Sequence, residues 1–388
     1  MSKIIYTIIA ALCCVAVFAD TEVVPDSVIY ENAYGTKTKS VYTCDANGYA
    51  KTITSYNKDK ETNSWVKYSL SELTHNAEGQ MLTRINSTWD ETNVVWIKTE
   101  KMEYVYNAEG KQTLYLHSKW DASTNDWVGD SKRETVYNED GTVDTDYSWS
   151  SGDWKPMHRE IVIKTGNTTT LIDQLSVGSS LVNYSRTIYN YNENGKPTSI
   201  VTATWDVDKE IFVDETRTLT TYNANNRNSE SITQQYDPTG DAWSNSERRV
   251  DTYGDNNTLT HVFYSWKQET DEWIPNNRQQ FTYNSQGKVL LFIGSSYNAA
   301  NDEWINSGKL EYTYSKQGWL LTFTSSNWNK TTNEWEMSIS YTYYYASITA
   351  INPTSAQCPT RNVKRFVNGH LYIEKQGEIY SVTGARVK

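Results

Sequence analysis

A repeat of about 31 residues is the feature that most constrains what this chain can fold into. Four copies carry a Tyr-Asn step followed by a glycine, looser copies end at Gly48, Gly79 and Gly318, and Asn226 and Asn257 take the glycine position in two others. Glycine and asparagine are the residues that best accept a positive φ angle, so this step predicts a tight turn. The spacing contracts over residues 142–188, and about ten copies fit between residues 30 and 345.

A second turn lies half a period away from the first. Its pattern is Asp-x-x-Thr-Asn-x-Trp with an aromatic residue in front, so two rings close the ends of the turn. The copies with tryptophan at both ends are Trp89 and Trp96, Trp120 and Trp127, Trp266 and Trp273, and Trp328 and Trp335. Between the turns, segments such as 309–314 alternate apolar and polar residues and are rich in Thr, Tyr, Val and Trp. This pattern predicts half-buried antiparallel strands.

The repeat therefore predicts an all-β fold, a long antiparallel meander of about twenty strands. A single hairpin cannot bury its aromatic face, so neighbouring copies must pack together. We expect a long curled sheet or solenoid whose aromatic face is covered by its own later turns, with a closed β-barrel as the alternative. The composition agrees, because 15 Trp and 29 Tyr in a chain of mean hydropathy −0.70 indicate a core of rings rather than of Leu and Ile.

Four segments are expected along the chain. Residues 1–19 have a lysine followed by an apolar run and small residues, which predicts a signal peptide cleaved after Ala19. Residues 20–345 form the repeat domain, residues 346–363 have the composition of a linker, and residues 364–388 form a small C-terminal β module. After the leader, no apolar stretch is long enough for a transmembrane helix.

The Tyr-Asn-x-x-Gly step resembles the YD (Rhs-type) repeats of bacterial surface and toxin-shell proteins. The resemblance covers most of residues 40–345, but only the Tyr-Asn/Asp-x-x-Gly core matches, and the Asp-x-x-Thr-Asn-x-Trp turn is not part of that pattern. It implies hairpins coiled into a large β structure outside the cell, with a structural or adhesive use.

The C-terminal segment resembles the sorting domain of the type IX secretion system in Bacteroidetes. In that family an Asn-Gly-x-Leu-x-Ile strand is followed by a turn, a Tyr-x-x-x-Gly step and a basic last strand. The residues that match are Asn368, Gly369, Leu371, Tyr372, Gly377, Tyr380 and Gly384. The resemblance implies that the secretion machinery is a partner and that the chain is exported to the outer surface or the medium, while the shortness of this segment leaves surface attachment open.

Catalytic and metal-binding patterns are missing from the sequence. The five histidines are dispersed with no second ligand at zinc spacing, and no nucleophile elbow, P-loop or dinucleotide motif occurs. We therefore expect no cofactor. The formal net charge of −11 disfavours nucleic acid as a partner. Outside the leader only Cys44 and Cys358 remain, and the sequence leaves open whether they pair.

The favoured interpretation is a secreted or cell-surface protein with a structural or adhesive role, not an enzyme, that binds glycan or an extracellular protein. The eight tryptophans named above are the candidate binding residues, although the same rings also suit the core of the sheet. One alternative is a glycan-active enzyme with its site in the irregular 142–188 region. A second alternative is an outer-membrane β-barrel, since strand length and strand-end aromatics match such proteins, although neither strand face is uniformly apolar.

Overall fold

The computed structural model describes residues 24–178 and 180–345, and the backbone of three strands between residues 363 and 381. These residues form strands and turns, with no helix assigned among them, so the all-β prediction is confirmed. The predicted signal peptide and its cleavage site after Ala19 lie outside the described residues, as does nearly all of the predicted linker.

Twenty-two strands form one sheet, and each is hydrogen-bonded to the strands before and after it in the sequence. Their bounds are β1 (Ser27–Asn32), β2 (Lys37–Cys44), β3 (Ala50–Lys58), β4 (Trp65–His75), β5 (Met81–Asp90), β6 (Val95–Tyr106), β7 (Gln112–Asp121), β8 (Asp126–Asn138), β9 (Gly141–Ser150), β10 (Asp153–Thr165), β11 (Thr168–Val177), β12 (Ser180–Tyr191), β13 (Pro197–Asp206), β14 (Ile211–Tyr222), β15 (Asn228–Asp237), β16 (Ala242–Gly254), β17 (Thr258–Lys267), β18 (Glu272–Tyr283), β19 (Val289–Asn298), β20 (Glu303–Tyr314), β21 (Leu320–Asn329) and β22 (Glu334–Tyr344).

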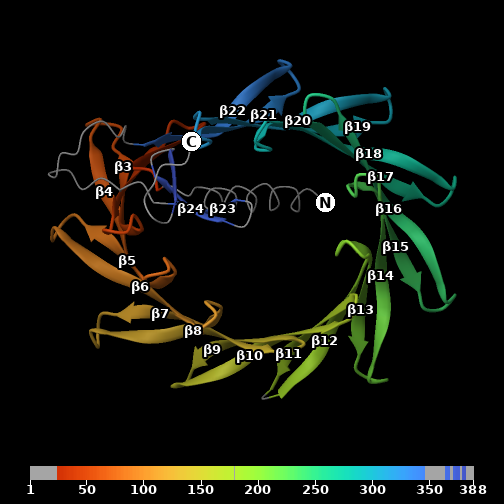
Figure 1. Cartoon of the computed structure of the whole chain (residues 1–388), viewed down its shortest axis with the longest axis horizontal. Coiled ribbons are helices and arrows are strands. Elements are labelled where there is room, and N and C mark those ends of the chain that lie inside the picture. The colour runs from red at the N-terminus through yellow and green to blue at the C-terminus, as the bar shows by residue number, and fades with distance from the viewer. Residues whose placement is uncertain (1–23, 179, 346–362, 368–369, 376–377, 382–388) are drawn as a thin grey trace.

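The sheet closes on itself into a barrel, which Figure 1 shows as a ring of strands seen end-on. The first strand pairs with both of its neighbours, because Tyr30 lies opposite Thr38 of β2 and opposite Tyr341 of β22. The closed-barrel alternative is therefore confirmed, and the curled sheet or solenoid is wrong. Closure pairs the two edge strands with each other, whereas a solenoid would have left both edges exposed.

The strand register explains why the ring closes at this size. A path that steps from each residue to its paired residue on the next strand goes once around the barrel and returns to β1. It arrives roughly 22 residues from where it started, so the shear is about one residue per strand. Equal strand number and shear are also found in the eight-stranded TIM barrel, where the strands tilt by about 36°. Because every hairpin repeats nearly the same offset, the twist accumulates evenly until the last strand meets the first.

The hand of the sheet decides which face lines the barrel. Strands of a closed barrel tilt in one sense, so the direction of the register displacement fixes the order of the strands as seen from outside. In an L-polypeptide, the neighbouring strand toward which a residue's N–H and C=O groups point then fixes the face that its side chain occupies. On β1, the N–H of Asn32 points to the β2 side, where it donates to the Thr36 carbonyl, so side chains with the parity of Asn32 point inward. Tyr30 therefore lies on the inner side, here called the lumenal face, and Ile29 lies on the outer face.

Both predicted turns have the backbone that their residues favour. Gly79 and Gly110 have φ of 85° and 76°, and Asn226 takes the same position with φ of 55°. The second turn also contains a left-handed residue, which is Asn125 in the copy that begins at Trp120. The turn chemistry was thus predictable from residue type alone.

The hairpins that end in the second turn bend away from the centre of the ring (Figure 1). The bend follows a β-bulge, as between Asn86 and Ser87 on β5, where an extra residue on the partner strand increases the local twist. Small residues occupy the concave side of the bend, which belongs to the outer face of the barrel. They lie two positions before the first ring of each pair. Ser87, Ser118 and Ala203 are only 4%, 6% and 1% exposed, so the bend leaves no room for a larger side chain.

The two faces of the wall differ in composition. On the outer face aliphatic residues alternate with charged ones, and neighbouring strands form ion pairs such as Arg248 with Glu230. The charged residues of this face include Glu72, Lys101, Glu103, Lys132, Glu134, Arg217, Glu230, Arg248, Lys309 and Glu311. The lumenal face carries aromatic rings on β20–β22, β1 and β2, aliphatic and small polar residues on β3 and β4, and mainly polar residues on β7–β17.

The C-terminal residues form a separate sheet of three antiparallel strands, β23 (Val363–Val367), β24 (His370–Lys375) and β25 (Glu378–Ser381). Val363 lies opposite Glu374, and Tyr372 lies opposite Ser381. The predicted small β module is therefore present as three strands. Cys44, at the end of β2, is disulfide-bonded, so it is not a free thiol.

Candidate functional site

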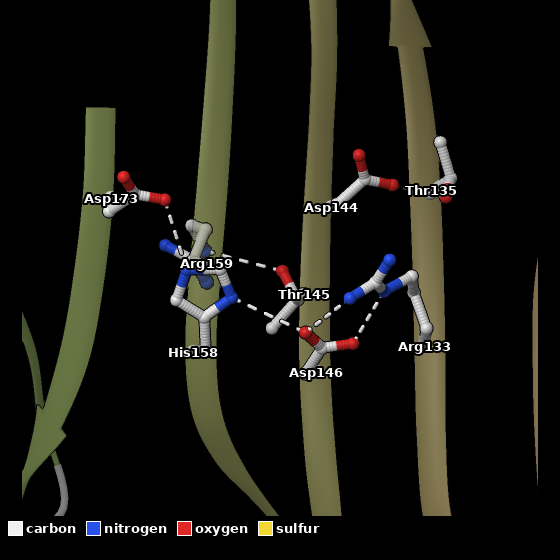
Figure 2. Close-up of polar contacts among 8 residues, drawn as sticks. All are labelled: Arg133, Thr135, Asp144, Thr145, Asp146, His158, Arg159 and Asp173. Carbon is white, nitrogen blue, oxygen red and sulfur yellow. Dashed lines mark hydrogen bonds and ion pairs between the residues drawn. The ribbon is translucent and has the colours of Figure 1, made fainter. Parts of the chain in front are cut away.

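A row of polar side chains crosses five consecutive strands on the lumenal face. It runs from Arg133 on β8 through Asp146 on β9, His158 on β10 and Asp173 on β11 to Ser185 on β12. Figure 2 looks onto this face and shows the side chains of the first four pointing toward one another. The row lies within or next to residues 142–188, where the sequence repeat is irregular. Rigid strands rather than loops hold it, so its geometry is fixed by the register of the barrel.

Arg133 and Asp146 form a bidentate ion pair. The Arg133 Nε and Nη2 groups donate to the two carboxylate oxygens of Asp146 over 2.6 and 2.7 Å. The bond from Arg133 holds the pKa of the Asp146 carboxyl below its usual range, against the opposing effect of partial burial and with further help from His158. Asp146 is therefore an anion at neutral pH, fixed in orientation by the planar guanidinium.

His158 bridges two carboxylates. Its Nδ1 lies 3.3 Å from Asp146 Oδ2, and its Nε2 lies 3.1 Å from Asp173 Oδ1. Both ring nitrogens of His158 therefore face a carboxylate, one on each neighbouring strand. The Ser185 hydroxyl donates to the other oxygen of Asp173 over 2.7 Å, which completes the row.

The order of these groups bears on catalysis. In a nucleophilic triad the hydroxyl bonds to the imidazole, whereas here the Ser185 hydroxyl bonds to the Asp173 carboxylate. Both nitrogens of His158 are engaged with carboxylates, so the ring is not placed to accept the hydroxyl proton. The arrangement fits a row of fixed hydrogen-bonding groups rather than a nucleophilic site.

Two further histidine–aspartate pairs lie on the same face. His117 Nδ1 is 2.9 Å from Asp130, which also bonds to Lys119, and His261 Nδ1 is 2.6 Å from Asp251. The side chain of Asp251 is only 2% exposed and also forms an ion pair with Arg249. His117, His158 and His261, which are far apart in the sequence, thus each have an aspartate partner on a neighbouring strand.

Hydroxyl groups continue the polar surface beyond Ser185. Thr202 on β13 bonds to Thr216 on β14 over 2.6 Å, and Thr218 bonds to Thr233 on β15 over 3.0 Å. Cross-strand pairs of this kind stabilise a sheet and present donors and acceptors along one face. With the charged row, they give the lumen a continuous hydrogen-bonding surface from β8 to β15.

The eight tryptophans predicted as binding residues lie in the outward-bending hairpins, away from this polar row. The structure brings them together in pairs, with ring centroids 4.9 Å apart for Trp89 and Trp96 and 5.0 Å apart for Trp120 and Trp127. The pairs Trp266 with Trp273 and Trp328 with Trp335 are both 4.9 Å apart, and all four contacts are edge-to-face.

Cations from the preceding hairpin cover several of these rings. Lys67 Nζ lies 4.2 Å from the Trp89 ring, and Lys98 Nζ lies 4.6 Å from the Trp120 ring. The tryptophans are half-buried as a result. Ring pairs and cations together join one hairpin to the next around the barrel, which is a structural use of these residues.

The structure also bears on metal ligands, on membrane-spanning helices and on the residues of the predicted sorting signal. Among residues 24–178 and 180–345, no group of His, Cys, Asp and Glu side chains is arranged to hold a metal ion. Within that same part of the chain, no helix has the length and apolar composition to cross a membrane. Leu371, Tyr372 and Tyr380 of the predicted sorting signal lie on β24 and β25, whereas Asn368, Gly369, Gly377 and Gly384 are outside the described residues.

Comparisons with known proteins place the chain in no family. The sequence matches no protein-family model and no curated protein. Among solved structures, it is similar to a porin-like protein from Bacteroides uniformis, at 9% identity over 71% of this chain and 95% of that one, with a TM-score of 0.31. A porin-like protein from Bacteroides vulgatus matches at 11% identity over 64% of this chain and 93% of that one, with a TM-score of 0.22.

A DUF3836 family protein from Parabacteroides distasonis matches at 22% identity over 30% of this chain and 93% of that one, with a TM-score of 0.22. At TM-scores this low, the matches establish neither a common fold nor a common function.

Proposed function

We propose that this protein is an exported barrel that binds a neutral, hydroxyl-rich polymer, a glycan, on the polar part of its lumenal face. The observation that carries the proposal is the row from Arg133 to Ser185, in which donors and acceptors alternate across five strands. A sugar hydroxyl both donates and accepts, so it pairs with either kind of group in the row.

The surroundings of the row support the same ligand class. The threonine pairs on β13–β15 extend the surface with neutral hydroxyl groups. Tyr189, on the lumenal face of β12, stacks with Tyr191 at 6.4 Å and adds aromatic surface beside the row. Fixed polar groups next to aromatic rings are the usual make-up of a site that orients a polar ligand.

Binding rather than hydrolysis is favoured by the state of the acids. Glycoside hydrolysis needs one carboxylic acid that donates a proton and one carboxylate that acts as base or nucleophile. Asp146 is fixed as an anion by Arg133, and Asp173 is bonded to His158 and Ser185. Acids held in this way support an orienting role, and the glycan-active alternative in region 142–188 gains nothing from their arrangement.

Calorimetric titration of the purified mature chain with a panel of neutral oligosaccharides tests the proposal. Arg133→Gln and His158→Gln should each weaken binding about tenfold, a loss of roughly 1.4 kcal/mol. Arg217→Gln is the matched control, because Arg217 lies on the outer face, where its Nε donates to Gln234. Circular dichroism checks that each variant is folded. Equal affinity of the Arg133 and Arg217 variants, or no binding across the panel, would overturn the proposal.

An outer-membrane barrel is the second candidate. Closure and an even number of antiparallel strands, most of them 10 to 13 residues long, favour it. The charged residues of the outer face oppose it, since a Lys or Arg facing lipid at mid-membrane costs about 2–4 kcal/mol. Flotation of the native protein with lipid vesicles decides between the two. Stable insertion selects the membrane barrel, and a monodisperse protein in buffer without detergent excludes it.

The proposed route to the outside uses both ends of the chain, a signal peptide over residues 1–19 and a sorting segment over residues 364–388. Cell fractionation with mass spectrometry of the termini tests this route. Recovery outside the cell of a chain that begins at Asp20 agrees with it, and a cytoplasmic chain that begins at Met1 contradicts it.

A further inference from the structure

Three large apolar side chains on one part of the lumenal face are far more deeply buried than most of the wall. Phe323, Tyr343 and Leu73 are 4%, 5% and 8% exposed, although most of the wall is only half-buried. All three lie on the side of the lumenal face formed by β20–β22 and β1–β4, here called its aromatic part after the rings on β20–β22, β1 and β2. Its rings pack against each other across strands. The ring centroids of Tyr312 and Phe323 are 5.1 Å apart, and those of Tyr30 and Tyr341 are 5.0 Å apart.

Two tyrosine hydroxyls at the end of β22 also indicate that another segment covers this part of the lumenal face. The hydroxyl oxygens of Tyr343 and Tyr345 are buried and have no hydrogen-bond partner among the residues that the structure describes. Burial raises the pKa of Tyr345 to about 12, and it also raises the pKa of Tyr343 and that of Tyr42 on β2. Hydroxyls facing an open, water-filled lumen would be solvated instead.

The disulfide of Cys44 links the end of β2 covalently to another segment. Cys44 shares the parity of Tyr42 and so lies on the lumenal face at the end of β2. The chain has four cysteines, and Cys13 and Cys14 belong to the expected signal peptide. Cys358 is therefore the one partner within the mature chain, and it follows Tyr345 by about 13 residues, a reach of up to roughly 45 Å when extended.

We propose that the C-terminal sheet β23–β25 docks on the aromatic part of the lumenal face and is held there by a Cys44–Cys358 disulfide. In the strand pairing Leu371 lies opposite Phe366 and Ile373 lies opposite Tyr380, so these four residues fall on one face of the sheet. Residues 346–388 carry six basic and two acidic residues in a chain of net charge −11, so the segment is attracted to the rest of the protein. In the end-on view of Figure 1, β23 and β24 are seen within the outline of the ring of strands.

This docking goes beyond the proposed glycan binding and does not depend on it. The segment occupies the aromatic side of the lumen and leaves the polar row on β8–β12 accessible. Barrels of this strand number leave room for such an internal element, since 22-stranded outer-membrane transporters hold a plug in the lumen.

Peptide mapping of the secreted protein without reduction tests the link. A disulfide-bonded peptide pair containing Cys44 and Cys358 is the expected result, and it should disappear after reduction. A Cys44 bonded to a second molecule, or a free Cys358 thiol, would overturn the proposal.

Tyrosine nitration followed by mass spectrometry tests the docking itself. In the full-length mature chain Tyr343 should react slowly, whereas Tyr34, which is 86% exposed, should react fully and serves as the internal reference. The double variant Phe366→Asp with Ile373→Asp places two charges in the C-terminal sheet without touching the barrel. Combined with Cys358→Ser, it should raise the nitration rate of Tyr343 at least fivefold while Tyr34 stays unchanged.

A matched variant, Lys388→Gln with Cys358→Ser, keeps the apolar residues of the sheet. It should leave Tyr343 protected if the apolar contact and not the disulfide alone holds the segment. Equal nitration of Tyr343 in the wild type and in the double-Asp variant would show that another part of the molecule covers this face. Oligosaccharide titration of the same variants keeps failure of docking distinct from failure of glycan binding.

Discussion

Val94 and Asn125 occupy the same turn position in successive repeats and share a left-handed backbone, with φ of 57° and 55°. Asparagine accepts this conformation readily, whereas a β-branched residue there is strained. The repeat thus imposes its turn geometry even where the local residue resists it.

Replacing Val94 by Asn should therefore stabilise the barrel by about 1 kcal/mol, by relief of backbone strain. Val94 is 68% exposed, so little buried apolar surface is lost. Urea unfolding followed by circular dichroism measures the change. The reciprocal variant Asn125→Val should destabilise by a similar amount, and a Val94→Asn variant no more stable than the wild type would contradict the strain argument.

Gly141 should tolerate alanine far less well than Gly195. A Cβ atom at Gly141 would lie 1.8 Å from the carbonyl oxygen of Val162, so the β9–β10 pairing would have to shift. Gly195 has φ of 70° and no atom within 4 Å of its Cβ position, so alanine there meets only the backbone penalty of about 1–2 kcal/mol. Thermal unfolding of the two variants compares them, and equal midpoints would count against a tight approach at Gly141.

Ala203 should be intolerant of a larger side chain because it fills the concave side of a bent hairpin at 1% exposure. Ala203→Leu should destabilise by about 1–3 kcal/mol through overpacking. Its neighbour Thr204 is exposed on the opposite face, so Thr204→Leu is the control and should stay within about 0.5 kcal/mol of the wild type. Chemical denaturation of both variants checks the difference, and similar losses would mean that the concave side is not tightly filled.

The Arg133–Asp146 pair should make stability depend on pH in the acid range. The pKa of Asp146 is lower in the folded chain than in the unfolded one, so its contribution is fully present above the unfolded value near 3.8. It is lost as the pH falls through the folded pKa. The urea midpoint of the wild type should therefore fall more steeply below about pH 4 than that of Asp146→Asn. Asp208→Asn, in an exposed turn, is the control, and parallel pH curves for the wild type and Asp146→Asn would refute the assignment.

Trp120 should contribute more to stability than to ligand binding. Its ring packs edge-to-face on Trp127 and lies 4.6 Å from Lys98 Nζ of the preceding hairpin. A double-mutant cycle of Lys98→Met and Trp120→Leu should give a coupling energy of about 0.5–1 kcal/mol. A coupling energy of zero, together with loss of glycan affinity in Trp120→Leu but not in Lys98→Met, would instead show that Trp120 binds the ligand.

The strand class, the two turns and the repeat followed from local chemistry. Positive φ at Asn226 and at the turn glycines is a property of those residue types, and alternation of apolar and polar residues marks a strand without any tertiary information. Half-burial of the tryptophans was also foreseeable, because their amphipathic rings recur at the ends of every hairpin.

Closure and the polar row were not accessible in this way. Whether β1 meets β22 depends on small register offsets summed over the whole sheet, and no single hairpin reveals that sum. His158 and Asp173 are 15 residues apart in the sequence and belong to different strands, so only their pairing brings them within 3.1 Å. An aspartate at matched parity on each neighbouring strand was the one available signal, and it can be read only once the register is known.

The sequence by itself determined that the chain forms about twenty aromatic-rich antiparallel strands, because turn residues and period-two patterns act over a few residues. Only the tertiary structure decided that these strands close into a ring, which face turns inward, and which charges meet there. These properties depend on accumulated twist and register, which are sums over all 22 strands rather than features of any one of them.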